Sequence, residues 1–189
     1  ARHNIAERPI WVTENGCRME GSGKIASCMA GIRAHSSEQE MIVAEFIPKM
    51  MILMQSLGVD RDFFFVLPPY NEYGGNKDWG LMRRDYTVKP GFAVFATLVD
   101  QLGNAIYEGE LELGKGIRGF VYRNPDDSKL LVYWSESELD TSDGVPQVNI
   151  NNPLTRNFSL KLDGNFSGTD SFGTPFTAIS HQGQLKLTA

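Results

Sequence analysis

The most constraining stretch of the sequence is Asp62–Leu67, DFFFVL, in which apolar side chains follow one another without alternation. An alternating pattern is typical of a strand with one solvated face, whereas an unbroken apolar run predicts a strand that is covered on both faces. We therefore expect Asp62–Leu67 to lie in a parallel sheet, with helices packed on one side and other apolar residues on the other.

A second strand is predicted near the start of the chain. Residues 9–13, PIWVT, are rich in β-branched and aromatic side chains, and the turn-forming pair Asn15-Gly16 ends this run. Residues 15–36 contain glycines, alanines, serines and scattered basic residues without a period, so they are predicted to form a long loop. Loops of this length are often functional.

A helix should connect the two strands. It begins at Ser37, where Ser37 and Glu40 have the spacing of a capping box, and Gly58 lies where it should end. Pro48 lies inside the helix and should kink or divide it. The apolar residues recur at helical spacing: Val43, Phe46, Ile47, Met50, Leu53, Met54 and Leu57.

A second helix should begin at Pro90 and end before Gly103, which completes a strand-helix-strand-helix order over residues 1–103. After Gly103 the pattern changes to short alternating runs separated by turn pairs, so residues 104–189 are predicted to form an antiparallel β-sandwich. The predicted class is thus α/β followed by all-β. The runs are 117–123, 129–135, 145–150, 156–162 and 174–187, and the turn pairs are Asp126-Asp127, Asp163-Gly164 and Gln182-Gly183.

The predicted α/β part is incomplete. A strand-helix-strand-helix unit cannot close a sheet by itself, because its outer strand edges and much of its apolar surface would lack partners. We expect this chain to be the C-terminal part of a larger protein, whose earlier residues supply the rest of the domain. A complete sheet built by these 189 residues alone would contradict this expectation.

Composition excludes several classes of function. The chain has a net charge of −5 and no basic run, so nucleic acid is not an expected partner. No apolar run approaches the roughly 20 residues that span a bilayer, so a membrane is not expected either, and the first residues lack the pattern of a signal peptide. The 41% of hydrophobic residues is normal for a soluble globular protein.

Several motifs resemble one group of enzymes, the (β/α)8-barrel retaining glycoside hydrolases of the clan A type, which pair a TIM barrel with a C-terminal β-sandwich. The resemblance covers residues 9–135 and implies that the chain contains the last two strand-helix units of the barrel. The matching residues are Trp11–Gly16 as strand 7, Phe63–Leu67 as strand 8, and Trp79-Gly80-Leu81 followed by Asp85, Thr87, Lys89 and Pro90 as the approach to helix 8.

The resemblance also implies a role for Glu14. The carboxylate that ends strand 7 is the nucleophile in that group, and Glu14 holds the matching place. The acid/base glutamate of the group ends strand 4, typically after an asparagine, and this chain contains no such segment. The remainder of the barrel, N-terminal to this chain, would have to supply it. A carbohydrate is the implied substrate, and no cofactor is implied.

Strand geometry supports Glu14 independently. Side chains alternate along a strand, so Ile10, Val12 and Glu14 should share one face and Trp11 and Thr13 the other. If the first set fills a barrel, Glu14 lies at the C-terminal mouth, where the active sites of barrels form. A retaining hydrolase needs a nucleophilic carboxylate and a second carboxyl group about 5 Å away. The alternative is a solvated glutamate beside an Asn-Gly turn.

The loop after the second strand is the other candidate for substrate binding. Aromatic side chains pack on the C–H faces of sugars, and polar side chains bind the hydroxyl groups. Tyr70 and Trp79 are the predicted aromatic contacts and Asn71 a polar one, while Trp79 could equally pack the loop onto the barrel. We interpret Glu72 as a surface or subsite residue rather than the acid, because it lies several residues past the strand.

The histidines and cysteines are the other residues that could carry chemistry. His35, just before the first helix, could reach the mouth of the site, but a histidine bonded to loop backbone is the favoured interpretation. His3 and His181 have no partner at metal-ligand spacing, so no metal is expected. Cys17 and Cys28 could form a local disulfide or remain free thiols.

The interpretation is a retaining glycoside hydrolase fragment that is inactive alone, with Glu14 as nucleophile and Tyr70, Asn71, Trp79 and His35 as candidate substrate contacts. If the full-length protein degrades polysaccharide, a secreted or periplasmic location is favoured. A non-catalytic carbohydrate-binding or structural protein that retains the scaffold is the alternative.

Overall fold

The structure is a computed structural model that describes residues 8–20, 36–72, 77–136 and 155–189. The chain forms two compact units, Ala1–Ala96 and Thr97–Ala189. The division falls inside a helix, and the predicted domain boundary after residue 103 stays a prediction. Within the described ranges, no helix combines the length and the apolar character that crossing a membrane requires.

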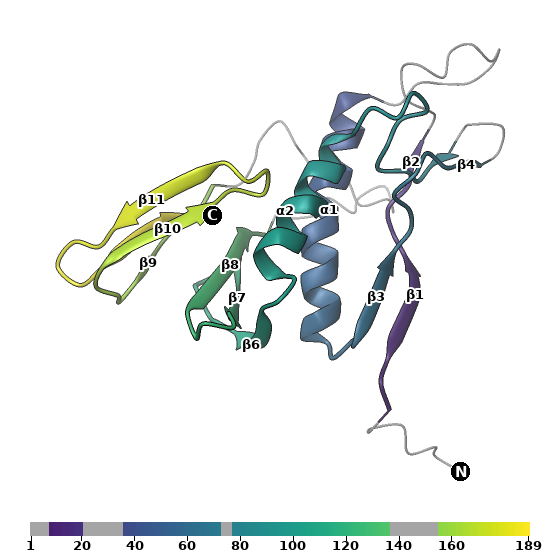
Figure 1. The fold of residues 1–189 in the computed structure, drawn as a ribbon. Helices are drawn as coiled ribbons and strands as arrows, with labels where there is room; N and C mark the ends of the chain where they lie inside the picture. The colour runs from purple at the N-terminus through teal and green to yellow at the C-terminus, as the bar shows by residue number, and fades with distance from the viewer. Residues whose placement is uncertain (1–7, 21–35, 73–76, 137–154) are drawn as a thin grey trace. The chain divides into compact units, whose positions relative to one another are not determined.

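In the first unit, β1, α1, β3 and α2 follow one another along the chain, with the short strands β2, β4 and β5 between them (Figure 1). Strands β1 and β3 pair in parallel, and α1 connects them, which confirms the predicted parallel pairing. In the described part of the chain this sheet has only these two strands, and β2, β5 and β4 form a small antiparallel sheet. The elements are β1 (Trp11–Asn15), β2 (Met19–Glu20), α1 (Ser37–Ser56), β3 (Arg61–Phe64), β4 (Asn71–Glu72), β5 (Lys77–Asp78) and α2 (Pro90–Leu102).

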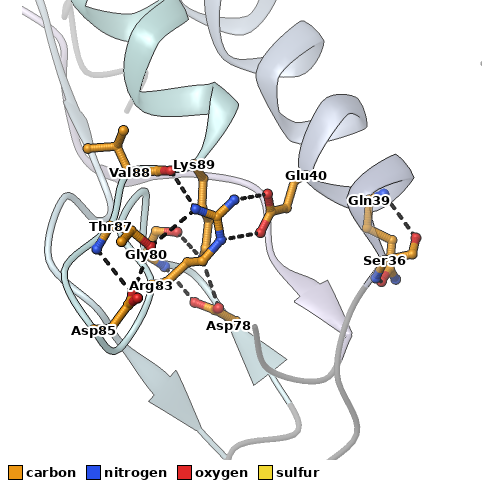
Figure 2. Close-up of polar contacts among 10 residues, drawn as sticks. All are labelled: Ser36, Gln39, Glu40, Asp78, Gly80, Arg83, Asp85, Thr87, Val88 and Lys89. Atoms are coloured by element: carbon orange, nitrogen blue, oxygen red, sulfur yellow. Dashed lines mark hydrogen bonds and ion pairs between the residues drawn. The ribbon is translucent and has the colours of Figure 1, made fainter. Parts of the chain in front are cut away.

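The N-cap of α1 is Ser36. Its hydroxyl accepts a hydrogen bond from the Gln39 N–H at 3.3 Å, and the Gln39 side chain accepts one from the Ser36 N–H at 3.0 Å (Figure 2). The predicted capping box of Ser37 and Glu40 is therefore wrong by one residue. Ser36 and Gln39 have the same spacing, and Glu40 is instead buried with a partner from another segment.

The end of α1 was predicted correctly. Gly58 has a φ of +84°, and the N–H groups of Gly58 and Val59 donate to the carbonyls of Gln55 and Met54. These bonds form a Schellman motif, which satisfies carbonyl groups that the helix itself leaves unpaired. Pro48 lies within a single continuous helix, so the helix is not divided there.

The core of the first unit lies between α1, α2 and the strands. Gly91 of α2 permits a close approach, because a Cβ atom there would lie 3.0 Å from Ile47 Cδ1 and 3.1 Å from Leu81 Cδ2. Cys17 is a partly buried free thiol whose pKa is raised by burial, and Cys28 lies outside the described residues. The core cluster consists of Met19, Val43, Ile47 and Leu81, with Cys17, Met51, Phe64, Phe92 and Phe95 packed against it.

The second unit contains antiparallel sheets, as predicted. One is three-stranded, β6-β7-β8, and two strand pairs join β9 to β12 and β10 to β11. The sequence did not predict β6 or β10, the predicted run 174–187 divides into β11 and β12, and the run 145–150 lies outside the described residues. The strands are β6 (Ile106–Glu110), β7 (Ile117–Arg123), β8 (Lys129–Ser135), β9 (Asn157–Leu160), β10 (Asn165–Thr169), β11 (Pro175–Ile179) and β12 (Leu185–Thr188).

Aromatic residues form the core of the three-stranded sheet. Phe120 and Tyr122 are fully buried, and Phe120 stacks on Trp134 with ring centroids 4.9 Å apart. Burial raises the pKa of the Tyr122 hydroxyl far above its ordinary value. The predicted turn at Gln182-Gly183 is confirmed, since both residues have a positive φ, as a tight hairpin turn requires.

Candidate functional site

A β-bulge in β1 determines the direction of Glu14. Val12 pairs with Asp62, but the next pair joins Asn15 to Phe64, so β1 has one more residue than β3 between these pairs. Paired residues of neighbouring strands lie on the same face, and Val12 and Asn15 therefore share a face despite their odd separation. Glu14, the neighbour of Asn15, is directed to the opposite face.

The two faces of the β1–β3 pair differ in their surroundings. On one face, Phe64 packs against Phe95 of α2, with ring centroids 5.8 Å apart. On the other, Trp11 and Phe63 contact each other at 6.1 Å but are 59% and 49% exposed. Glu14 is exposed as well. We call this second face, which carries Trp11, Glu14 and Phe63, the open face.

This arrangement corrects the predicted alternation. Glu14 shares its face with Trp11 rather than with Val12, because the bulge reverses the pattern after Val12. Ile10 is half exposed and fills no interior among the described residues. A bulge depends on how β1 pairs with β3, and the sequence of β1 alone contains no sign of it.

The residues after Glu14 fix the end of β1 against β3. The Phe65 N–H donates to the Asn15 carbonyl at 2.7 Å, and a Cβ atom at Gly16 would lie 2.1 Å from the Phe65 carbonyl oxygen. Strand β1 ends at Asn15, as predicted, but residues 16–18 do not form the predicted tight turn. Gly16 serves close backbone approach instead. The peptide bond between Phe65 and Val66 is cis.

Asp62 pairs with Val12 and lies on the helix-covered face. Its Oδ2 accepts a hydrogen bond from Asn15 Nδ2 at 3.2 Å, while its buried Oδ1 has no hydrogen-bond partner among the described residues. Burial raises the pKa of this carboxyl group, and the bond from Asn15 opposes the rise. Because Asp62 and Glu14 lie on opposite faces, Asp62 is not placed to be the second carboxylate of a retaining pair.

Aromatic side chains gather where β3 ends. The Phe65 ring contacts Tyr70 at 5.0 Å and Trp79 at 6.1 Å, both edge to face, and the Trp79 N–H donates to the Tyr70 carbonyl at 3.0 Å. The structure therefore brings together the two predicted aromatic contacts, Tyr70 and Trp79, beside the backbone that follows Glu14. We call Phe65, Tyr70 and Trp79 the aromatic cluster.

Two other predicted contacts are not described in atomic detail. Asn71 lies in β4, where it pairs with Asp78 of β5, but its side chain is outside the part of the structure that is described. His35 falls in the undescribed range before α1. Their predicted roles in substrate binding stay predictions.

A buried ion pair holds the segment that carries Trp79. Lys89 Nζ donates to Asp78 Oδ2 at 2.7 Å and to the Gly80 carbonyl at 2.5 Å, and Asp78 Oδ1 accepts from the Gly80 N–H at 3.0 Å (Figure 2). The two charged side chains are only 2% and 4% exposed. Burial lowers the pKa of the Lys89 ammonium group, and Asp78 opposes this shift. We call these contacts the clamp.

A second ion pair fastens the same segment to α1. Arg83 binds the Glu40 carboxylate through Nε at 3.0 Å and Nη2 at 2.5 Å, and its Nη1 donates to the Val88 carbonyl at 2.6 Å (Figure 2). We call this pair the anchor. Sequence reasoning missed Asp78, Arg83 and the role of Glu40, because ion pairs between residues far apart in the chain leave no periodic signal.

The described residues include no group of three or more His, Cys, Asp or Glu side chains that could hold a metal ion. What they do show is one exposed carboxylate, Glu14, on the open face, and a backbone after it that contacts the backbone of Phe65 in the aromatic cluster. A carboxylate of this kind can act as a nucleophile or a base, and aromatic rings can pack on an apolar ligand face.

In comparisons with known proteins, the fold matches that of one solved structure. No model of a protein family matches the sequence, and no curated protein matches it. The structure is similar to that of a family 39 glycoside hydrolase from the gut symbiont Bacteroides cellulosilyticus WH2, with a TM-score of 0.63 and 14% identity. The match covers 95% of this chain and 31% of that chain, so this chain spans about a third of its neighbour's length. At this identity the similarity is one of scaffold.

Proposed function

We propose that this chain is the C-terminal part of a retaining glycoside hydrolase, in which β1 and β3 are the last two strands of a (β/α)8 barrel and Glu14 is the nucleophile. The second unit would be its β-sandwich domain. The observation that carries the proposal is the bulge that directs Glu14 to the open face, at the carboxyl ends of the strands.

The exposed apolar side chains of the open face support an incomplete barrel. Trp11 and Phe63 are each about half exposed, although aromatic residues in strands are usually covered. A parallel sheet is normally buried on both faces. The remainder of the barrel, supplied by earlier residues, would cover this side and pair with the strand edges.

In the proposed reaction a Glu14 oxygen attacks the anomeric carbon of the sugar. The glycosidic C–O bond breaks, and the leaving oxygen takes its electron pair and a proton from an acid in the N-terminal part of the barrel. Water, activated by the same group, then attacks the anomeric carbon and releases Glu14 from the ester. The configuration is inverted twice and so is retained.

The aromatic cluster would bind the substrate beside Glu14. Tyr70 is 41% exposed and Trp79 is partly buried, so both present ring surface to which a sugar face can pack. This assignment favours a pyranose or furanose ring with an exposed C–H face over a flat, charged ligand, because the cluster is apolar and the protein is acidic overall.

Covalent trapping tests the nucleophile. The complete protein is incubated with activated aryl 2-deoxy-2-fluoroglycosides of several sugars, and peptide mass spectrometry should find one sugar bound to Glu14. Glu14→Gln should lower kcat by more than about 10³-fold without lowering Tm, because the covalent path is lost. The control is Glu112→Gln, at an exposed carboxylate of the second unit.

A Glu14→Gln protein that retains full turnover would remove Glu14 from the mechanism. If no glycoside is hydrolysed but sugars still bind, the protein is instead a carbohydrate-binding protein that retains the scaffold. The azide ion gives a further check, since it should restore turnover to Glu14→Ala and produce a glycosyl azide of inverted configuration.

A further inference from the structure

The clamp surrounds one residue of the aromatic cluster. Asp78 and Gly80 are the two chain neighbours of Trp79, and Lys89 Nζ binds both of them, at 2.7 Å and 2.5 Å. Asp78 also accepts the Gly80 N–H, so the backbone is fixed on either side of Trp79.

The approach of this segment to the end of β3 is also tight. A Cβ atom at Gly80 would lie 2.5 Å from the Pro68 carbonyl oxygen, and the Trp79 N–H donates to Tyr70. The Trp79 ring meets Phe65 edge to face at 6.1 Å but remains partly exposed. The backbone around Trp79 is therefore fixed, while part of its ring is left accessible.

A buried ion pair usually contributes little to the stability of the folded state. Desolvation of two charges offsets most of their attraction, and a well-packed apolar pair of similar volume is often as stable or more stable. Burial lowers the pKa of Lys89, which is a sign of this desolvation. What the charges provide is geometry, because Lys89 bonds an oxygen on each side of Trp79.

We propose that the clamp is a positioning device, which holds the Trp79 ring as a platform for a sugar beside Glu14. This inference rests on the proposed function and adds to it the positioning residues Lys89 and Asp78. Neither touches the substrate, and both act through Trp79.

The anchor provides a matched control. It is also an ion pair, it stabilises the same segment, and it involves Glu40, which is 7% exposed. The hydrogen bonds of Arg83 run to Glu40 of α1 and to Thr87 and Val88. Glu40 and Arg83 also act on the Lys89 charge, but with opposite signs, so a variant that neutralises both changes this influence little. Loss of the anchor should therefore loosen the segment without releasing Trp79.

The test is a double-mutant cycle on the complete protein. The variants are Trp79→Ala, the neutral clamp variant Asp78→Asn with Lys89→Met, and the two combined. The asparagine side-chain oxygen can still accept the hydrogen bond from the Gly80 N–H, which favours folding. Trp79→Ala should raise KM about tenfold, and the clamp variant should raise KM similarly. In the Trp79→Ala background, the clamp variant should have no further effect on KM.

A second measurement is independent of turnover. The protein is labelled with 5-fluorotryptophan, and the Trp79 signal is identified by its loss in Trp79→Phe. The clamp variant should shift or broaden this ¹⁹F signal, whereas the neutral anchor variant, Glu40→Gln with Arg83→Met, should leave it and KM unchanged.

The outcomes separate the two proposals. Additive effects on KM, or an unchanged ¹⁹F signal in the clamp variant, would overturn the positioning role. If Glu14→Gln keeps full turnover while the clamp variant changes the ¹⁹F signal of Trp79, the proposed function is overturned. The positioning of Trp79 by the clamp then stands.

Discussion

The parallel pair β1–β3 and the three-stranded sheet β6-β7-β8 use aromatic residues in opposite ways. In the three-stranded sheet, Phe120 and Tyr122 are fully buried. In the parallel pair, Trp11 and Phe63 are 59% and 49% exposed, although their rings are also in contact with each other. The large side chains of the three-stranded sheet are covered, whereas those of the parallel pair lie on an uncovered face.

Packing explains the large apolar side chains at buried positions, whereas those at exposed positions need another explanation. Full burial of a Phe side chain stabilises the folded state by about 1.5–3 kcal/mol, and a half-exposed ring forgoes about half of this free energy. Phe120 is therefore accounted for by the stability of its own unit. Under the proposed function, further barrel strands would cover Trp11 and Phe63.

The largest effect on the free energy of unfolding should come from the three-stranded sheet β6-β7-β8. Phe120→Ala should lower the free energy of unfolding by about 3–5 kcal/mol, because it leaves a cavity in a closed core. Phe176→Ala, at a ring that is 39% exposed, should cost about 1 kcal/mol or less. Chemical denaturation of both variants checks the contrast, and equal losses would show that exposure does not distinguish these positions.

An intermediate effect is expected where the parallel strands meet. Gly16→Ala should destabilise the protein by about 1–3 kcal/mol, because its Cβ atom would collide with the Phe65 carbonyl oxygen. It should also lower kcat by about 100-fold, since the strand that carries Glu14 must move.

Gly58→Ala is the control for Gly16→Ala. No atom lies within 4 Å of its Cβ position, but its φ is +84°, so it should cost about 1 kcal/mol and leave kcat unchanged. If Gly16→Ala retained normal kcat, the end of β1 would not be what holds Glu14 in place.

The smallest effect concerns the helix-covered face. Burial raises the pKa of Asp62, so the folded protein holds this proton at pH values where the unfolded chain has already released it. Asp62 therefore makes the protein less stable as the pH rises from the ordinary carboxyl range through the raised pKa. This loss of stability is absent at pH values below the ordinary carboxyl pKa, and it stays constant at pH values above the raised pKa.

Asp62→Asn should remove this pH dependence. The difference in unfolding free energy between variant and wild type should grow in favour of the variant across the window and then level off. Denaturation curves at several pH values provide the measurement. A difference that does not depend on pH would show that Asp62 titrates normally in the folded protein.

Much of the element order could be predicted from the sequence. The helix from Pro90, the stop at Gly58 and the strands over 117–123 and 129–135 depend on local patterns of apolar residues, proline and glycine. The capping box was misplaced by one residue, because two overlapping sets of residues have the required spacing. Strands β6 and β10 were missed, since their alternation is weak.

The sequence by itself determined which residues are candidates for the site, Glu14, Tyr70 and Trp79, and their roles stay predictions. Only the tertiary structure decided how they are presented. The bulge in β1 exists only through pairing with β3, and the clamp joins Lys89 to Asp78 through a buried contact. Local patterns fix which residues form strands and helices, whereas direction and burial depend on partners that are distant in the chain.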